Sequence, residues 1–135
     1  MKIYHDLLTD HYRNPRNKGH LKKPDFSSAQ FNPSCGDSVI FEGTIRNGRI
    51  ATVAFDGAGC VISQAAASLL SEVVIGKTVG EILKLDTAFM KELVGIPLGP
   101  VRLKCALLPL QALHDGINRY LSSQDNNAQS PKTAT

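Results

Sequence analysis

The sequence predicts one domain in which a small antiparallel sheet is followed by helices. Two β-rich runs, 39–45 and 50–55, flank Asn47-Gly48, and Asn-Gly is the strongest two-residue signal for a hairpin turn. After residue 60 the apolar residues recur at helical spacing instead. With 135 residues, 42% of them hydrophobic, the chain is long enough to bury one core without disulfides.

The segment before the hairpin predicts a helix, a basic loop and a short strand. Apolar and aromatic residues recur at helical spacing over residues 3–12, and Pro15 disfavours a helical Asn14, so the helix is expected to end there. Residues 11–24 contain several basic side chains and no acid. We interpret this loop either as a surface for an acidic partner or as an ordinary solvated loop. Residues 28–31 are predicted to add a third strand to the hairpin.

Three further helices are expected after the hairpin, and their ends carry recognisable signals. The first begins at residue 61, is largely buried and ends before Gly76. The second starts at the Thr-Val-Gly-Glu capping box of residues 78–81. The third is capped by Asp86 or Thr87 and ends near residue 94.

The last apolar helix face is predicted over residues 107–121. Pro109 is compatible with a helix only in the first turn, so Cys105 is expected to precede this helix. Residues 122–135 are polar and have almost nothing to bury, which predicts a disordered tail. The predicted organisation is therefore a domain over residues 1–121 and a tail over residues 122–135.

The hairpin turn also predicts which residues of its two strands face each other. When the ladder is extended backwards from the turn, Cys35 falls opposite Cys60, with Asp37 two residues further along. Cys60 also precedes a helix, where unpaired backbone N–H groups favour a thiolate. Two thiols and a carboxylate are therefore expected to meet at one edge of the sheet, and the fold is expected to bring Cys105 to them.

Three thiols and one carboxylate from separate segments predict a metal site formed by Cys35, Asp37, Cys60 and Cys105. Thiolates are soft ligands for Zn²⁺ and for the irons of an Fe–S cluster, and four converging donors suit a tetrahedral or cluster-sized site. Three interpretations compete with this one. Cysteine is often only a small buried residue. A catalytic thiol would need a histidine partner, for which the sequence gives no cue. A plain structural zinc domain has little use for Asp37 in place of a fourth thiolate.

The composition gives no support for nucleic acid or a membrane as partner. The sequence has 15 basic and 12 acidic residues, a net charge of +3, which is too mild to indicate either, and it contains no recognisable nucleic-acid-binding motif. The N-terminus shows no uninterrupted apolar segment that would suit a signal peptide or a membrane span. Three cysteines is an odd number, so we expect reduced thiols and a cytoplasmic protein.

Several short stretches of the sequence form a combined pattern. They are residues 11–17 (His-Tyr-Arg-Asn-Pro-Arg-Asn), 32–37 (Asn-Pro-Ser-Cys-Gly-Asp), 59–60 (Gly-Cys), 76–78 (Gly-Lys-Thr) and 101–106 (Val-Arg-Leu-Lys-Cys-Ala). Taken together, over roughly residues 4–121, these stretches resemble the iron–sulfur cluster assembly scaffolds of the IscU, SufU and NifU N-terminal domain family.

This resemblance implies an α+β fold, in which helices pack mainly on one face of a small three-stranded antiparallel sheet, with a partly exposed metal site at one sheet edge. It implies a scaffold rather than an enzyme. Such a scaffold accepts sulfur from a cysteine desulfurase, binds iron, assembles a transferable [2Fe-2S] cluster and hands it to apo iron–sulfur acceptor proteins. An iron donor or a chaperone would be further partners. The alternative within the family is a SufU-type protein that holds Zn²⁺, relays sulfur and stimulates the desulfurase.

The sequence combines features of two branches of that family. Lys104 precedes the last cysteine, as in SufU proteins, where IscU proteins have a histidine that can bind metal. The extra segment that SufU proteins carry before this cysteine is absent, and residues 98–102 only partly resemble the Leu-Pro-Pro-Val-Lys chaperone-binding motif of IscU. Three thiolates and a carboxylate around a divalent metal leave an excess of negative charge. Lys104 is therefore predicted to offset that charge, the alternative being a solvated lysine.

The four predicted ligands are expected to have different roles. Asp37 is a harder donor than a thiolate and should hold cluster iron more weakly, which suits a site that releases its cargo. Sulfur transfer requires one thiolate to attack the donor persulfide, and Cys35 and Cys105 are the candidate sulfur acceptors. Cys60, nearest to a helix N-terminus, is predicted to be the most purely structural of the three.

Overall fold

The computed structural model describes the backbone of residues 2–134 and the side-chain environments of residues 6–124. Its elements follow the order α1 (Lys2–Arg13), β1 (Phe26–Asn32), β2 (Asp37–Arg46), β3 (Arg49–Ala58), α2 (Val61–Val74), α3 (Val79–Leu83), α4 (Thr87–Val94) and α5 (Pro100–Ala134). A run of strands followed by a run of helices is typical of an α+β fold. The predicted fold class is therefore confirmed.

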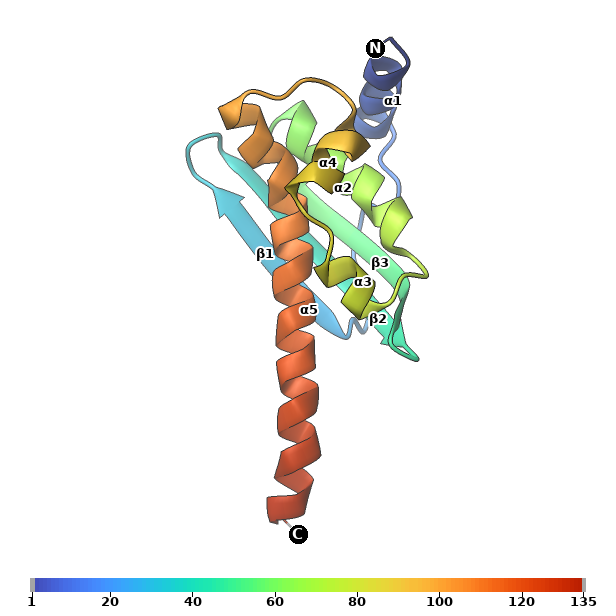
Figure 1. Cartoon of the computed structure of the whole chain (residues 1–135), viewed down its shortest axis with the longest axis vertical. Coiled ribbons are helices and arrows are strands. Elements are labelled where there is room, and N and C mark those ends of the chain that lie inside the picture. Colours follow the sequence, from blue (N-terminus) through green and yellow to red (C-terminus); the bar gives the residue numbers. More distant parts are fainter. Residues whose placement is uncertain (1, 135) are drawn as a thin grey trace.

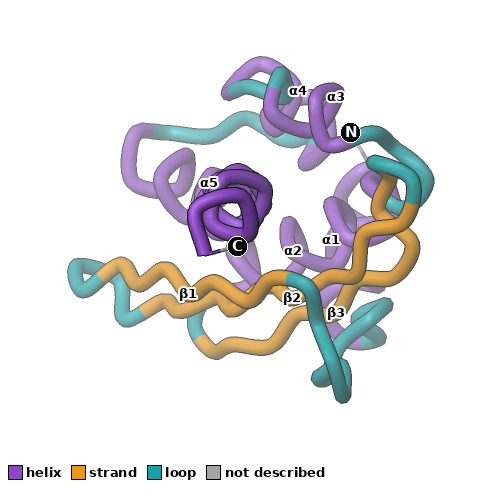
Figure 2. The backbone as a smooth tube through the Cα atoms, turned by 90° about the horizontal axis from the view of Figure 1, so that it is seen from below, coloured by secondary structure: helices purple, strands orange, loops and turns teal. Residues whose placement is uncertain are grey.

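The sheet is covered by helices on one face. Its strands lie in the order β1-β2-β3, and both neighbouring pairs are antiparallel. Figure 2 shows the helices gathered on one side of the sheet. In Figure 1, α5 crosses the sheet beside β1, and α2 lies next to it over β3. α5 contacts β1, β2 and α2, while α1 packs against α2, so the predicted arrangement is confirmed.

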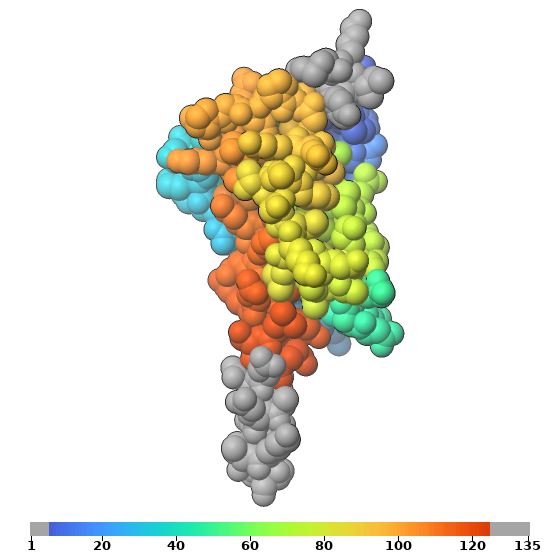
Figure 3. Space-filling view, viewed as in Figure 1, coloured from blue at the N-terminus to red at the C-terminus, as the bar shows by residue number. Residues whose placement is uncertain are grey.

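The hydrophobic core lies between the sheet and the helices α2 and α5. Phe41 of β2 and Phe55 of β3 pair across the sheet and are fully buried, with ring centroids 5.9 Å apart. Leu70 of α2 and Leu113 and Ile117 of α5 are equally inaccessible. Figure 3 shows that the side chains of α3 and α4 spread over this helical layer from outside. The core therefore fixes α5 against the strands, and with it the position of Cys105.

The predicted hairpin forms, but a bulge shifts its register by one residue. Ile45 pairs with Ile50, as predicted. The next pair is Thr44 with Thr52, which leaves Ala51 as an extra residue in β3. Every residue of β2 beyond the bulge therefore faces a partner one position further along β3 than the turn alone predicts.

The apolar pattern of β3 gives this bulge a physical cause. Ile50 and Phe55 are both 1% exposed, yet their odd spacing would point them to opposite faces of an unbroken strand. The inserted residue lets both face the core. The strand pairing ends with Ser38 opposite Ala58, so the predicted placement of Cys35 opposite Cys60 in the ladder is wrong.

The last helix begins earlier than predicted. α5 starts at Pro100, so that Cys105 lies in its second turn and not before the helix. Proline at the first helical position has a suitable φ and no N–H to satisfy, and Pro100 provides this start signal. Pro109 is buried in the helix interior and not in the first turn as predicted. Because proline has no N–H, the Cys105 carbonyl lacks its usual donor four residues on.

The other predicted helix signals are confirmed. α2 ends just before Gly76, which has a φ of 90°. Thr78 and Glu81 make both hydrogen bonds of the capping box of α3. Asp86 caps α4 through the Phe89 N–H, and this helix ends at Gly95 in the left-handed conformation.

The helix α5 is assigned as far as Ala134, and Figure 1 shows its C-terminal part extending beyond the sheet. The segment 122–135, predicted as a disordered tail, begins inside this helix, and the side chains of residues 125–135 lie outside the described part. The domain boundary at residue 121 and the disorder of the tail stay predictions. Among the described helices, none is both long and apolar enough to cross a membrane.

Candidate metal centre

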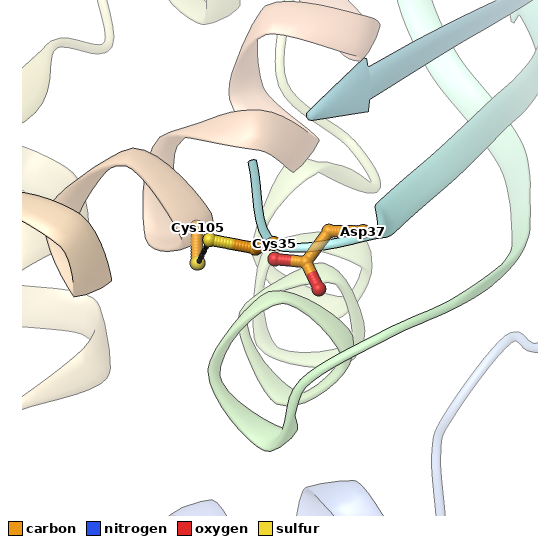
Figure 4. Close-up of side chains that lie close together, drawn as sticks. All are labelled: Cys35, Asp37 and Cys105. Carbon is orange, nitrogen blue, oxygen red and sulfur yellow. Dashed lines mark hydrogen bonds between the residues drawn. The ribbon is translucent and has the colours of Figure 1, made fainter. Parts of the chain in front are cut away.

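The four predicted ligands come from different segments that meet at one end of the sheet. Cys35 lies in the turn before β2, Asp37 is the first residue of β2, and Cys60 directly precedes α2. Cys105 is supplied by α5. Figure 4 shows the side chains of Cys35, Asp37 and Cys105 pointing toward one another from these segments.

The donor atoms of this group are close enough to share a metal ion. One ligand atom each from Cys35, Asp37 and Cys105 lie within 4.8 Å of one another. The Sγ atoms of Cys35 and Cys105 are 3.7 Å apart. Cys60 is outside that group of three. It contacts one member, because the Sγ atom of Cys60 lies 3.4 Å from Oδ2 of Asp37. The structure therefore brings all four predicted ligands together, in two contacting pairs.

Two of these separations match those of ligands around one four-coordinate metal ion. Bonds of about 2.3 Å to sulfur and about 2.0 Å to oxygen, at tetrahedral angles, place two sulfurs about 3.7 Å apart and a sulfur and an oxygen about 3.5 Å apart. The structure has 3.7 Å between the sulfurs of Cys35 and Cys105, and 3.4 Å between Cys60 Sγ and Asp37 Oδ2. Cys60 lies outside the group of three donors, so its thiol must move closer to share one ion with all of them. The chemistry of the donors suits Zn²⁺, and thiolates are also the usual ligands of cluster iron.

Asp37 is held in a fixed orientation by the segment that leads into α2. Its side chain is fully buried, and Oδ1 accepts a 2.8 Å hydrogen bond from the Cys60 N–H. Gly59 has a φ of 134°, and a Cβ at this position would lie 2.1 Å from Asp37 Oδ1. A glycine is therefore required here both by the backbone conformation and by the close approach of the carboxylate.

Cys105 is the most buried of the three cysteines, with 3% of its surface exposed. Burial raises the pKa of the Cys105 thiol well above its usual value, and the neighbouring Asp37, Cys35 and Cys60 raise it further. Without a metal this group is therefore a thiol at neutral pH. A metal that binds Cys105 must displace its proton, which makes metal affinity increase with pH.

An open pocket of about 450 Å³ lies against the three thiols. Besides the cysteines it is lined by Leu8, Thr9, Val61, Ile62, Ile96, Val101 and Arg102. The sequence does not predict this apolar rim, because leucine, valine and isoleucine at helical spacing indicate only ordinary packing. Sulfur or metal donors can thus reach the thiols through a largely apolar mouth.

Lys104 does not line the pocket beside the thiols. Its side chain is exposed and lines a groove of about 250 Å³ together with Phe31, Pro33 and Leu108. Phe31 is itself 64% exposed. The predicted role of Lys104 in offsetting the charge of the site stays a prediction.

The described histidines form hydrogen bonds away from the cysteines. His11 Nδ1 lies 2.7 Å from Ser68 Oγ, His20 Nε2 lies 3.0 Å from Asp56 Oδ2, and His114 Nε2 lies 2.7 Å from the Ile82 carbonyl. Among the side chains that the structure describes, no thiol therefore has the histidine partner of a cysteine-dependent enzyme.

The sequence matches the family described as "NifU-like N terminal domain" over residues 3–127. It is 36% identical over 129 residues to "Iron sulfur cluster assembly protein 1, mitochondrial" of Debaryomyces hansenii, which covers 91% of this chain and 70% of the relative. It is 30% identical over 132 residues to "Zinc-dependent sulfurtransferase SufU" of Bacillus subtilis, which covers 85% of this chain and 89% of the relative.

A solved structure shows the same fold. It is that of a putative iron–sulfur cluster assembly scaffold protein for the SUF system from Fervidobacterium islandicum AW-1, with a TM-score of 0.75 and 27% identity. The likeness covers 86% of this chain and 97% of that one. Because the family pattern spans nearly all of the described residues and two relatives share 30% identity or more over most of the chain, the protein belongs to the NifU-like N terminal domain family.

Proposed function

We propose that this protein is an iron–sulfur cluster assembly scaffold. It accepts sulfur from a cysteine desulfurase, binds iron, assembles a [2Fe-2S] cluster as its cargo and passes the cluster to apo iron–sulfur acceptor proteins. The ligands are Cys35, Asp37, Cys60 and Cys105. The observation that carries the proposal is the convergence of three thiols and one buried carboxylate beside an open pocket.

The ligand set suits a site that releases what it binds. A structural zinc site is closed and commonly uses four cysteine or histidine ligands. Here one ligand is an oxygen donor, which binds iron less strongly than a thiolate, and Cys35 and Cys60 are only half buried. This role is that of a scaffold and not of an enzyme, because the donors hold and release a cargo, and among the described side chains no thiol has a histidine partner.

The second candidate is a zinc-bound sulfur relay that stimulates the desulfurase without building clusters. The distances within the two contacting pairs of donors support it as much as the scaffold, since each matches the spacing of two ligands around a tetrahedral zinc ion. Lys104 favours it as well, because a lysine and not a metal-binding histidine precedes Cys105. The relative named as a zinc-dependent sulfurtransferase supports the same candidate.

The partners follow from this function. A desulfurase would bring its persulfide to the apolar mouth beside Cys35, and apo acceptors would approach the same opening. Residues 98–102, at the start of α5, include the exposed Val101 and Arg102 and would be accessible to a chaperone. An iron donor would complete the set, and we place these events in the cytoplasm.

The two candidates differ in the metal that the site keeps. The purified protein is analysed for zinc, then treated anaerobically with ferrous iron and sulfide while its visible absorption is recorded. A scaffold develops charge-transfer bands, and Cys35→Ser weakens or abolishes them while the exposed neighbouring change Ser34→Ala does not. Stoichiometric zinc that iron cannot displace would support the relay instead.

A further inference from the structure

Sulfur arrives at this site in a different oxidation state from the one that a cluster contains. The outer sulfur of a persulfide must gain two electrons before it becomes the sulfide of an Fe–S cluster. The inference that follows rests on the proposed function. It concerns the group near the accepting thiol that supplies these electrons. A second thiol can do so if it forms a disulfide with the first.

The three cysteines are not equivalent in this respect. Cys105 donates its S–H toward the sulfur of Cys35, with the two Sγ atoms 3.7 Å apart, as the dashed line in Figure 4 marks. Cys60 is engaged differently, because its Sγ lies 3.4 Å from Asp37 Oδ2 and 3.8 Å from Ser63 Oγ. Among the described thiols, the shortest contact is therefore that of Cys35 with Cys105, whereas Cys60 is held by a carboxylate and a hydroxyl.

The members of this pair also differ in their access to a donor. Cys35 is half buried in the turn before β2, whereas Cys105 is 3% exposed on α5. A bulky persulfide donor reaches Cys35 first, and Cys105 stays behind it. This division corresponds to an accepting thiol and a resolving thiol.

We propose that Cys105 releases sulfide from a persulfide on Cys35. The Cys105 sulfur attacks the inner sulfur of the Cys35 persulfide anion, a Cys35–Cys105 disulfide forms, and the bond between the two persulfide sulfurs breaks. The outer sulfur leaves as HS⁻ with the proton of the Cys105 thiol. The two thiols lose the two electrons that the sulfur gains, so atoms, charge and electrons balance without another reductant.

The local structure allows the small movement that this step requires. A disulfide bond of about 2.05 Å requires the sulfurs, now 3.7 Å apart, to approach by about 1.7 Å. Cys35 lies in a turn whose next residue, Gly36, has a φ of 70° and open space where a Cβ would be. On the other side, Pro109 cannot donate to the Cys105 carbonyl, so this turn of α5 lacks one helix hydrogen bond.

The released sulfide stays beside the ligands that assemble the cluster. After the step, Cys60 and Asp37 are still available to hold iron, while Cys35 and Cys105 are oxidised. A cellular dithiol or monothiol reductant must reopen the disulfide before all four donors bind a cluster. Sulfide is thus released first, and all four ligands become available for the cluster only after the disulfide is reduced.

The test measures sulfide and the fate of the thiols together. The full chain, reduced and freed of metal, is mixed anaerobically with a persulfidated and desalted cysteine desulfurase, with no other thiol present. Sulfide is quantified as its bimane adduct, and intact mass and peptide mapping locate the sulfur and any disulfide. The wild type is expected to release one sulfide per chain, to lose two hydrogens and to contain a Cys35–Cys105 disulfide, while Cys60 remains a free thiol.

Two variants sharpen the test. Cys105→Ser is expected to keep one added sulfur on Cys35 and to release no sulfide, whereas Ser34→Ala should behave as the wild type. Sulfide release by Cys105→Ser at the wild-type rate, a disulfide that includes Cys60, or a stable persulfide on the wild type would each overturn the inference.

If Cys105→Ser takes up no sulfur at all, the role of Cys35 as sulfur acceptor fails as well. A wild type that still forms a cluster from inorganic iron and sulfide keeps the scaffold function even if the inference fails.

Discussion

At the scale of single residues, the site depends on how Asp37 is held. Its Oδ1 accepts the Cys60 N–H, its Oδ2 contacts the Cys60 thiol, and Gly59 leaves the space that its carboxylate occupies. The carboxylate is thus oriented by Gly59 and Cys60, the two residues between β3 and α2. A ligand fixed in this way needs little rearrangement when a metal binds.

Gly59→Ala tests this arrangement. The new Cβ would lie 2.1 Å from Asp37 Oδ1, so the carboxylate must turn away from the site. We expect the affinity for Zn²⁺ to fall by roughly 10–100-fold, as for other changes in groups that orient metal ligands. Affinity is measured by competition with a chromophoric chelator.

Gly48→Ala is the matched control, because Gly48 also has a positive φ, of 74°, but open space where the Cβ would be. Both variants should lose stability from backbone strain, by about 1–3 kcal/mol, and only Gly59→Ala should lose metal affinity. Equal affinities in the two variants would show that the fixed position of Asp37 is unimportant.

The residue types of the site could be predicted from the sequence, but their pairing could not. Three cysteines and Asp37 were recognisable as metal donors from chemistry and from the Gly-Cys and Cys-Gly-Asp stretches. The contact of Cys35 with Cys105 depends on where α5 begins, and the lack of a strand pairing between Cys35 and Cys60 depends on the bulge in β3. The sequence pattern predicts that start too late, because both Pro100 and Pro109 suit a first helical turn and Pro100 has this role.

At the scale of elements, α1 is anchored to α2 by a buried histidine. His11 is 2% exposed, and its Nδ1 lies 2.7 Å from Ser68 Oγ. The Ser68 hydroxyl accepts the Arg16 N–H, so it can donate its own hydrogen to Nδ1. The neutral ring then carries its proton on Nε2, which lies 3.5 Å from Glu72. This anchor positions Leu8 of α1 against the mouth of the metal site.

The anchor predicts a specific dependence of stability on pH. Burial lowers the pKa of His11 below its usual 6.5, the charge of Arg16 adds to this, and Glu72 and Asp10 oppose it. Below about pH 6.5 the unfolded chain therefore binds a proton that the folded protein excludes, and stability falls as pH falls, by at most about 1.4 kcal/mol per pH unit for one proton. His11→Gln should lose less stability than the wild type between pH 7.5 and 5.5 in urea unfolding of the apo protein.

His20 provides the control with the opposite sign. Hydrogen bonds that its ring donates to the carboxylates of Asp56 and Glu42 raise its pKa, so its contribution to stability is present below pH 6.5 and is lost as pH rises through the raised value. His20→Gln should therefore lose more stability on acidification than the wild type. A wild type and a His11→Gln variant with parallel pH profiles would contradict the assignment of His11 as a neutral buried group.

The hairpin shows what element-level prediction missed and why. The turn fixed the pairs next to it, but the register further away depends on which side chains the core must bury. Ile50 and Phe55 have an odd spacing and both face the core, which only an inserted residue allows. The odd spacing of these two apolar residues is visible in the sequence. The apolar pattern therefore indicates a bulge, although the turn does not.

At the scale of the whole molecule, the fold assembles the site from parts that are distant in sequence. The turn before β2, the junction between β3 and α2, and the second turn of α5 meet at one end of the sheet, with α1 beside them. The α+β class and the single covered face of the sheet follow from pattern and resemblance. The packing of α1 at the mouth does not, because it depends on tertiary contacts such as that of His11 with Ser68.

A metal that bridges these segments should also stiffen them. Without it, the clustered donors must protonate or separate, and part of the metal-binding free energy is lost from the fold. On chelation we expect faster amide hydrogen exchange in residues 34–37, 57–60 and 103–105, while Val53 and Leu69, both buried in the core, stay protected. Unchanged exchange in all three segments would show that the site is not coupled to the fold.

The proposed function requires that Cys35, Asp37, Cys60 and Cys105 hold a [2Fe-2S] cluster and can transfer it to an acceptor protein. Wild type and Asp37→Ala are reconstituted anaerobically, mixed with an apo-ferredoxin, and followed by circular dichroism as the cluster changes its protein environment. Asp37→Ala keeps all three thiolates and removes the oxygen donor that we propose to weaken the hold on the cluster. We predict that the wild type transfers its cluster and that the variant acquires one, transfers it more slowly and accumulates in the cluster-bound form. Transfer from the variant as fast as from the wild type would contradict the role of Asp37, and no cluster on either protein would contradict the scaffold function itself.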